Sequence, residues 1–351
     1  MDQLCSNYII NHLPTLYGGK QDDFQRTSAS LVSIVVDMIK TGAHFREILE
    51  FLRSERSTLA YKHETPLKEK FGIARSGPLA PQVGEQFLGN SGTPLDFPFE
   101  SYNLSLLSQL RAHISLRTKI SYVEEIFLGR QFVYEIRLLD KRDFKQIKLC
   151  PSYDVDCSYN EARKLKKLNP EGYARLALKI QLAAIRVWYP PEIEENKATL
   201  ILVGTLSAEI DKMLVPLGQH ITWLNDTPGE DPFERMLKYS KCTVVHQDIF
   251  SIDETLEEIE LLFRDCITWT PASPLQTLKE RIALLRFYLA YCMPHFRGDG
   301  AIGDWIELAI YHYHGFTRTR HRKDASPAHA PLSSILPTEY FKSLDTTIII
   351  E

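Results

Sequence analysis

Three short apolar runs, separated by segments of helical length, constrain the fold of this chain more than any other feature. They are residues 199–203, 220–224 and 242–246, and the intervening segments 207–214 and 232–239 are compatible with short helices. Continuous apolar runs are typical of strands buried on both faces, and their alternation with helices is typical of a parallel sheet. The sequence therefore predicts an α/β fold with a Rossmann-like mixed or parallel sheet flanked by helices.

Helical periodicity precedes these runs. Apolar residues recur at helical spacing over residues 22–54, with a break at Thr41-Gly42, which predicts two helices packed as a hairpin. The chain is then expected to divide into three parts. These are a helical N-terminal region (1–104) with a long Gly- and Pro-rich loop (76–98), an α/β nucleotide-binding-like domain (105–316), and a basic tail containing proline and serine (317–351).

The remaining segments also carry recognisable periodicities. Helices are expected at 104–129, 160–188, 253–263, 275–293 and 303–314, and strands at 132–139, 145–150 and 266–269.

Composition limits the classes of function. The 351 residues are 44% hydrophobic and 25% charged, as in globular proteins, and the net charge of −4 gives no global attraction to nucleic acid. No apolar run is long enough to cross a bilayer, so no membrane partner is expected. The six scattered cysteines form no CxxC pair and indicate reduced thiols. With no signal sequence visible, the expected location is cytoplasmic or another reducing compartment.

Polar residues follow the three apolar runs. Gly204 comes after the first, Asp226 after the second and Asp248 after the third. In a parallel sheet these ends meet at one edge, where ligands bind. An acidic residue about 20 residues beyond a first-strand glycine is placed to accept hydrogen bonds from ribose hydroxyls.

The stretches 200–204, 224–226 and 245–250 resemble class I S-adenosylmethionine-dependent methyltransferases, in the layout of the viral cap-methylating type. The resemblance implies that Gly204 and Asp226 border S-adenosylmethionine and that Asp248 lies near its adenine. It further implies that Lys179 binds or deprotonates the acceptor hydroxyl and that Glu307 is a supporting carboxylate. A relative that has lost catalysis, a pseudoenzyme, is included in this prediction, because the first loop contains only one glycine.

The turn at residues 293–305 is the most unusual local stretch. Three glycines within six residues join two helices, and backbone N–H groups at a helix N-terminus form an anion site, with Arg297 and Asp299 as candidate ligand-binding residues. The stretch also resembles the signature loop of Fic-type nucleotidyl transferases, which implies that His295 deprotonates the target hydroxyl. The alternative is a tight corner between helices, with Asp304 capping the second one.

Other constellations leave further alternatives open. Arg163 and Lys164 belong to a basic stretch that is a candidate RNA-binding site. His312 and His314 are two residues apart and point to different faces of a helix, so no metal site is expected. The second function class is a non-enzymatic protein that binds a protein partner and uses the α/β unit as a scaffold. A third is a nucleotidyl or phosphoryl transferase using the His295 turn.

Overall fold

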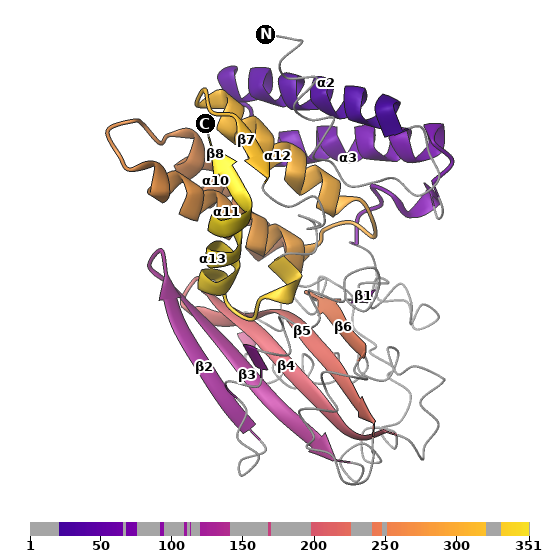
Figure 1. Ribbon diagram of the computed structural model, residues 1–351, viewed down its shortest axis with the longest axis vertical. Coiled ribbons are helices and arrows are strands. Elements are labelled where there is room, and N and C mark those ends of the chain that lie inside the picture. Colours follow the sequence, from indigo (N-terminus) through magenta and orange to yellow (C-terminus); the bar gives the residue numbers. More distant parts are fainter. Residues whose placement is uncertain are drawn as a thin grey trace. The chain divides into compact units, whose positions relative to one another are not determined.

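The computed structural model describes residues 21–65, 68–75, 92–94, 109–110, 113, 120–140, 168–169, 198–225, 241–247, 251–320 and 331–350 (Figure 1). The chain forms two compact units. Unit 1 comprises Met1–Ala74, Glu254–Leu332 and Pro337–Glu351, and unit 2 comprises Arg75–Asp253 and Ser333–Leu336. The protein is therefore mixed α/β, as the sequence predicts, and among the described residues the long helices lie in unit 1 and the main sheet lies in unit 2.

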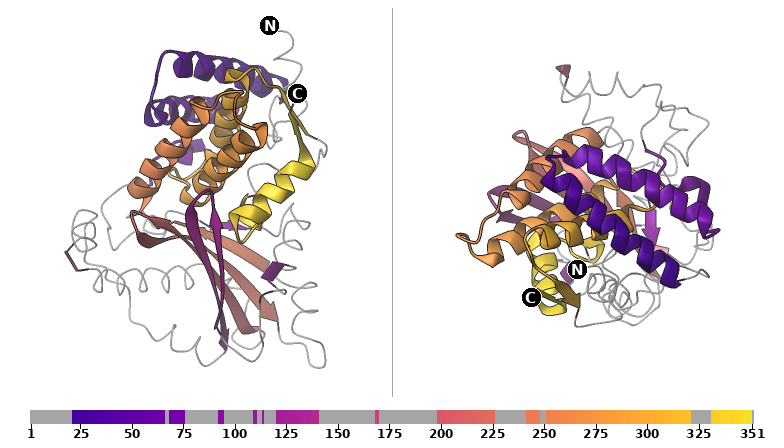
Figure 2. Two further views of the ribbon diagram at one scale, coloured as in Figure 1. Left: turned by 90° about the vertical axis from the view of Figure 1, so that its left-hand side faces the viewer. Right: turned by 90° about the horizontal axis from the view of Figure 1, so that it is seen from above.

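Unit 1 begins with the predicted helical hairpin. Helix α2 (Gln21–Lys40) and helix α3 (Phe45–Lys62) lie side by side (Figures 1 and 2) and are joined at Thr41-Gly42, where Gly42 has φ +85°. A capping interaction starts α3, because the backbone N–H of His44 donates to the Glu47 carboxylate at 2.8 Å. The helical spacing of the apolar residues thus predicts both helices correctly.

Four further helices complete unit 1, together with a small pair of strands. They are α10 (Ile252–Ile267), α11 (Leu275–Cys292), α12 (Asp299–Tyr313) and α13 (Pro337–Thr347), with the short 3₁₀ turns η1 (Lys68–Lys70) and η2 (Pro331–Ser333). Strand β7 (Arg318–Arg320) pairs antiparallel with β8 (Ile348–Ile350). The segment expected to form a tail therefore supplies a helix and two paired strands. Tyr340 of α13 is buried.

The strand expected at 266–269 is absent from unit 1. Helix α10 instead continues to Ile267. Ile259, Leu262, Phe263 and Cys266 are all buried, and their spacing of three and four residues follows one helical face. The apolar residues at the end of the helix continue this face and do not begin a new element.

Helix α12 occupies the centre of unit 1 and packs against α2, α3 and α11. Ten consecutive residues, from Ile302 to Tyr311, are buried. A helix buried on all sides is expected only in a core, where neighbouring elements cover every face. Its hydrophobic residues fill this core, and its polar side chains must find partners inside it.

Unit 2 contains a six-stranded sheet in the order β1-β6-β5-β4-β3-β2. Every neighbouring pair is antiparallel. The Rossmann-like parallel sheet is therefore not what the described strands form. The strands are β1 (Gly92–Pro94), β2 (Ile120–Phe127), β3 (Arg130–Asp140), β4 (Ala198–Ile210), β5 (Met213–Asn225) and β6 (Lys241–His246).

Tight hairpins replace the crossover helices that a parallel sheet requires. Leu128 and Gly129 join β2 to β3, and Asp211 and Lys212 join β4 to β5; all four residues have positive φ, as two-residue hairpin turns demand. Residues 207–214 are consequently strand and turn where a helix was expected. Residues 120–127 form a strand within the region 104–129, also expected to be helical. The elements expected at 145–150, 160–188 and 232–239 lie outside the described residues, apart from two residues of the second.

A glycine in the middle of β4 creates a polar contact inside the sheet. Gly204 pairs with Ile136 on one side and His220 on the other. With no side chain at Gly204, the ring of Tyr134 lies over the glycine, and its hydroxyl is 2.8 Å from Nδ1 of His220. A Cβ built on Gly204 would lie 1.8 Å from that hydroxyl. Gly204 is therefore required for close side-chain approach.

None of the helices among the described residues is long and apolar enough to cross a membrane.

Replacing Gly204 by alanine should lower the free energy of unfolding by about 1–3 kcal/mol, because the new methyl group overlaps Tyr134 in a packed interior. Denaturant-induced unfolding measures this change. In a Tyr134→Ala background the same substitution should add little, since the overlapping ring is gone. Equal costs in both backgrounds would contradict the proposed overlap.

Candidate functional site

The turn between α11 and α12 is built by two residues with left-handed backbone. Helix α11 ends at Cys292, and the next residue, Met293, has φ +39° and is followed by Pro294, a residue that cannot continue the helix. Gly298 precedes α12 with φ +107°, a value that favours glycine. The chain therefore reverses over residues 294–298, and α12 begins at Asp299, earlier than the predicted start at residue 303.

His295 and Asp299 form a buried pair inside this turn. Nδ1 of His295 lies 2.6 Å from Oδ1 of Asp299, and the backbone N–H of His295 donates to Oδ2 of Asp299 at 2.9 Å. Each residue is 4% exposed. Because both carboxylate oxygens are used, Asp299 fixes the imidazole and the backbone that carries it. His295 and Asp299, two candidate site residues from the sequence analysis, are therefore in direct contact.

The segment following η1 supports the turn from one side. Phe71 forms a parallel bridge with Arg297, and the N–H of Gly72 donates to the carbonyl of Arg297 at 3.1 Å. The N–H of Phe296 donates to the carbonyl of Ile73 at 2.9 Å. The backbone of His295 and of the two residues that follow it is thus held by a strand-like segment more than 200 residues earlier in the chain.

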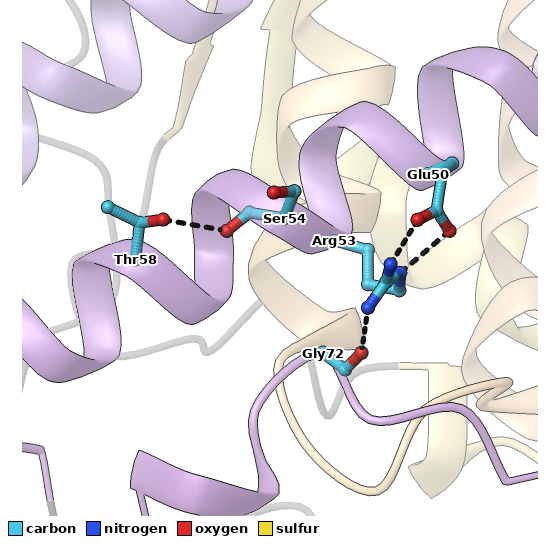
Figure 3. A network of polar contacts seen from close by, with 5 residues as sticks. All are labelled: Glu50, Arg53, Ser54, Thr58 and Gly72. Atoms are coloured by element: carbon cyan, nitrogen blue, oxygen red, sulfur yellow. Dashed lines mark hydrogen bonds and ion pairs between the residues drawn. The ribbon is translucent and has the colours of Figure 1, made fainter.

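Helix α3 in turn holds this segment (Figure 3). Arg53 donates from Nη1 to the carbonyl of Gly72 at 2.7 Å and from Nε to the Glu50 carboxylate at 2.7 Å, and its Nη2 also contacts that carboxylate. The hydrogen bond from Arg53 lowers the pKa of Glu50, with a smaller contribution from the charge of His295. Glu50 therefore lies within electrostatic range of the imidazole.

Arg56, one turn further along α3, is buried against aromatic rings. Its guanidinium carbon lies 4.2 Å from the ring centre of Phe71 and 5.7 Å from that of Phe24. Burial lowers the pKa of Arg56 to about 10. A Cβ on Gly298 would lie 2.8 Å from Cγ of Arg56, so the glycine allows the arginine stem to pass against the beginning of α12.

The charged residues around the turn form two ion pairs, and two arginines remain outside these pairs. Glu50 is paired with Arg53, and Asp299 is paired with His295. Arg56 and Arg297 form no ion pair with another residue of the part of the chain that the structure describes. The turn consequently combines an oriented imidazole, a helix N-terminus and two guanidinium groups, which together suit an anionic ligand.

Glu307 belongs to a different, buried cluster. Its carboxylate lies 3.2 Å from Nε of Arg286 and 2.5 Å from Nη1 of Arg318, and Asp304 lies 3.2 Å from Nη2 of Arg286. All four side chains are at most 3% exposed. Asp304 therefore pairs with Arg286 of the neighbouring helix. One alternative expected Asp304 to cap α12, and the structure shows that it does not. Gly303 makes room, because a Cβ there would lie 1.9 Å from Nη1 of Arg286.

Of the residues expected to form the S-adenosylmethionine site, only Gly204 and Glu307 lie in the described part of the chain. Gly204 lies inside an antiparallel strand under Tyr134, where no parallel strand ends converge. Lys179, Asp226 and Asp248 lie outside the described residues, as do the candidate RNA-binding residues Arg163 and Lys164.

Sequence reasoning missed the contribution of α3. Glu50, Arg53 and Arg56 recur every three residues, so they lie along one side of the helix, and this spacing was the available signal. Nothing in the local sequence relates these residues to a turn that follows 240 residues later. Among the described residues, no group of three or more His, Cys, Asp or Glu side chains is suited to holding a metal ion.

No protein-family model matches this chain, and no curated protein matches it. The assignment of a function therefore depends on the geometry of the site.

Replacing Glu307 by glutamine should lower the free energy of unfolding by about 3–5 kcal/mol, because two buried guanidinium groups lose their shared carboxylate. Asp37 is a matched control, since it forms an exposed ion pair with Lys40 at 3.1 Å. Asp37→Asn should change stability by less than about 0.5 kcal/mol. A stable Glu307→Gln protein would show that the buried network does not hold unit 1 together.

Proposed function

We propose that unit 1 transfers a phosphoryl or nucleotidyl group from a nucleotide to a hydroxyl group, with His295 as the general base. The observation that supports this function is the orientation of His295 by both oxygens of Asp299, directly before the N-terminus of α12. One turn thus provides two parts of such a site. The imidazole held by a carboxylate is a general base, and the helix end beside it can bind the phosphoryl group that the hydroxyl attacks.

The hydrogen bond to Asp299 determines which nitrogen acts. A carboxylate accepts hydrogen bonds, so Nδ1 of His295 carries the proton at this contact. In the neutral ring, Nε2 then has the lone pair and is the nitrogen that removes a proton from the attacking hydroxyl. The hydroxyl oxygen bonds to phosphorus as the bond from phosphorus to the leaving oxygen breaks, which releases ADP in phosphoryl transfer from ATP or pyrophosphate in nucleotidyl transfer. The 2.9 Å bond from the His295 backbone to the same carboxylate limits movement of the ring, which is the preorganisation that proton transfer needs.

The beginning of α12 supplies the complementary charge. The first N–H groups of a helix have no acceptors within the helix, and no side chain caps the glycine at its start. These groups and the positive end of the helix dipole stabilise negative charge that develops on a transferring phosphoryl group. Arg297, in the same turn, adds a positive charge near this position.

Methyl transfer from S-adenosylmethionine stays a prediction. Only Gly204 of its three expected cofactor residues lies in the described part of the chain, and its environment is apolar sheet interior and the Tyr134 ring. The partner-binding alternative has one supporting observation. Among the described strands, β2 lies at one edge of its sheet and exposes three large residues, Ile120, Tyr122 and Ile126. Exposed apolar rows on edge strands are typical of surfaces that pair with another chain.

Removing the base should abolish transfer without unfolding the protein. We expect His295→Gln to lower the rate of phosphoryl or nucleotidyl transfer from ATP by about 10²–10⁴-fold, because general base catalysis contributes that much. Asp299→Asn should also lower the rate, since it removes the charge that orients the ring. Radiolabel transfer to protein or small-molecule hydroxyls measures the rate. His44→Gln, at an exposed histidine of the same unit, is the control. Equal activity of the His295 and His44 variants would refute the role of His295.

Ligand-induced thermal stabilisation separates the candidate functions. ATP at 100 times its dissociation constant should stabilise the protein by about 2.7 kcal/mol, and S-adenosylmethionine should have no effect. Stabilisation by S-adenosylmethionine or S-adenosylhomocysteine alone would favour the methyltransferase prediction instead. The absence of stabilisation by all three ligands would favour partner binding.

A further inference from the structure

Arg56 is a buried cation without a counter-charge. It is 5% exposed, and Nε and Nη1 are fully buried with no hydrogen-bond acceptor in the described part of the chain. A buried charge is unfavourable unless it is paired, and a buried donor without an acceptor loses its hydration without compensation. Stacking on Phe71 and Phe24 offsets only part of this cost. The position of Arg56 therefore requires an explanation beyond packing.

The surroundings of Arg56 point to the beginning of α12. Its stem passes Gly298, the residue that precedes the helix, at a distance that no other residue would allow. Its guanidinium stacks on Phe71, and the backbone of Phe71 pairs with Arg297, one residue before Gly298. The stem of Arg56 thus lies beside the residue that precedes α12, and its guanidinium has no carboxylate partner in the described part of the chain.

The carboxylates nearby are already engaged. Glu50 is bound by two nitrogens of Arg53, and Asp299 is bound by the ring and backbone of His295. Neither carboxylate has a hydrogen bond with Arg56. An external anion is therefore the group that would complete the site.

We propose that Arg56 and the first turn of α12 bind a phosphate group of the ligand. This inference rests on the proposed function in one respect: the phosphate belongs to the nucleotide whose group is transferred at His295. Nη2 is the guanidinium nitrogen that is not fully buried, and it can donate to one oxygen of a phosphate, while helix N–H groups donate to another. Arg56 acts in binding, and His295 acts in proton transfer.

The aromatic contacts make this binding site rigid. Phe71 and Phe24 hold the guanidinium plane in one position. The backbone of Phe71 is tied to the turn, and Arg53 holds the adjacent Gly72. A phosphate that meets Arg56 therefore meets a donor set whose orientation is already fixed, which lowers the entropic cost of binding.

The test measures thermal unfolding of the full chain with increasing inorganic phosphate and, separately, pyrophosphate, at constant ionic strength maintained with chloride. The wild-type midpoint should rise by at least about 3 °C at saturation. Arg56→Met keeps the stem and removes the charge, so its phosphate-dependent rise should be lost. Without phosphate, its midpoint should equal or exceed that of wild type, because an uncompensated buried charge has been removed.

Two further variants complete the design. Arg56→Lys keeps the charge without the planar donor set and should weaken phosphate affinity by about tenfold, a result that holds even if Arg56→Met fails to fold. Arg26→Met, at an exposed arginine of α2, should respond to phosphate as wild type does. No phosphate-specific rise in the wild type, or an equal rise in Arg56→Met or Arg56→Lys, would overturn the proposal.

The outcome is separable from that of the proposed function. His295→Gln should still bind phosphate with wild-type affinity, because the imidazole is not a phosphate ligand in this proposal. Phosphate binding that depends on Arg56, in a protein without transfer activity, would refute the proposed function and support the binding site. Transfer activity that is unchanged in Arg56→Met, with unchanged phosphate binding, would refute the binding site alone.

Discussion

The burial of α12 on every side is the constraint on which unit 1 depends. A core helix that carries Asp304 and Glu307 needs positive partners inside the core, since buried carboxylates are too unfavourable to remain unpaired. Arg286 comes from the neighbouring helix α11, and Arg318 comes from strand β7. The ion pairs therefore link three consecutive elements, α11, α12 and β7, and hydrophobic packing alone does not specify that arrangement.

Two glycines, one in α12 and one directly before it, each leave space for an arginine side chain. Gly303 admits Arg286, and Gly298 admits Arg56, and in both cases a Cβ would collide with the arginine. At Gly303 the admitted guanidinium meets carboxylates. At Gly298 the stem of the arginine passes the beginning of the helix, and its guanidinium meets the rings of Phe71 and Phe24. The glycine-rich sequence that marks this turn thus reflects close arginine approach as well as a tight reversal of the chain.

Sequence reasoning predicted the helices better than the sheet. The helices α2, α3 and α11 follow from spacing, because one buried face imposes a period of 3.6 residues. Strands β3, β4, β5 and β6 of unit 2 were predicted, but β1 and β2 were not, and the parallel direction expected for β4, β5 and β6 was wrong. Leu202 and Val203 are both buried, so both faces of β4 are covered. A continuous apolar run indicates that a strand is buried on both faces, but it does not indicate whether the strand pairs in parallel or antiparallel direction. The decisive turn, Asp211-Lys212, contains no glycine and gave no hairpin signal.

The candidate site was predicted only where it is local. His295, Arg297 and Asp299 lie within five residues, so their proximity follows from the sequence. Arg56 depends on tertiary packing, which periodicity does not reveal. Its contrast with Arg286 and Arg318 is informative, because all three arginines are buried around one helix and only Arg56 lacks a carboxylate. The same helix thus has an interior in which two arginines pair with carboxylates and, beside its beginning, a buried arginine without such a partner.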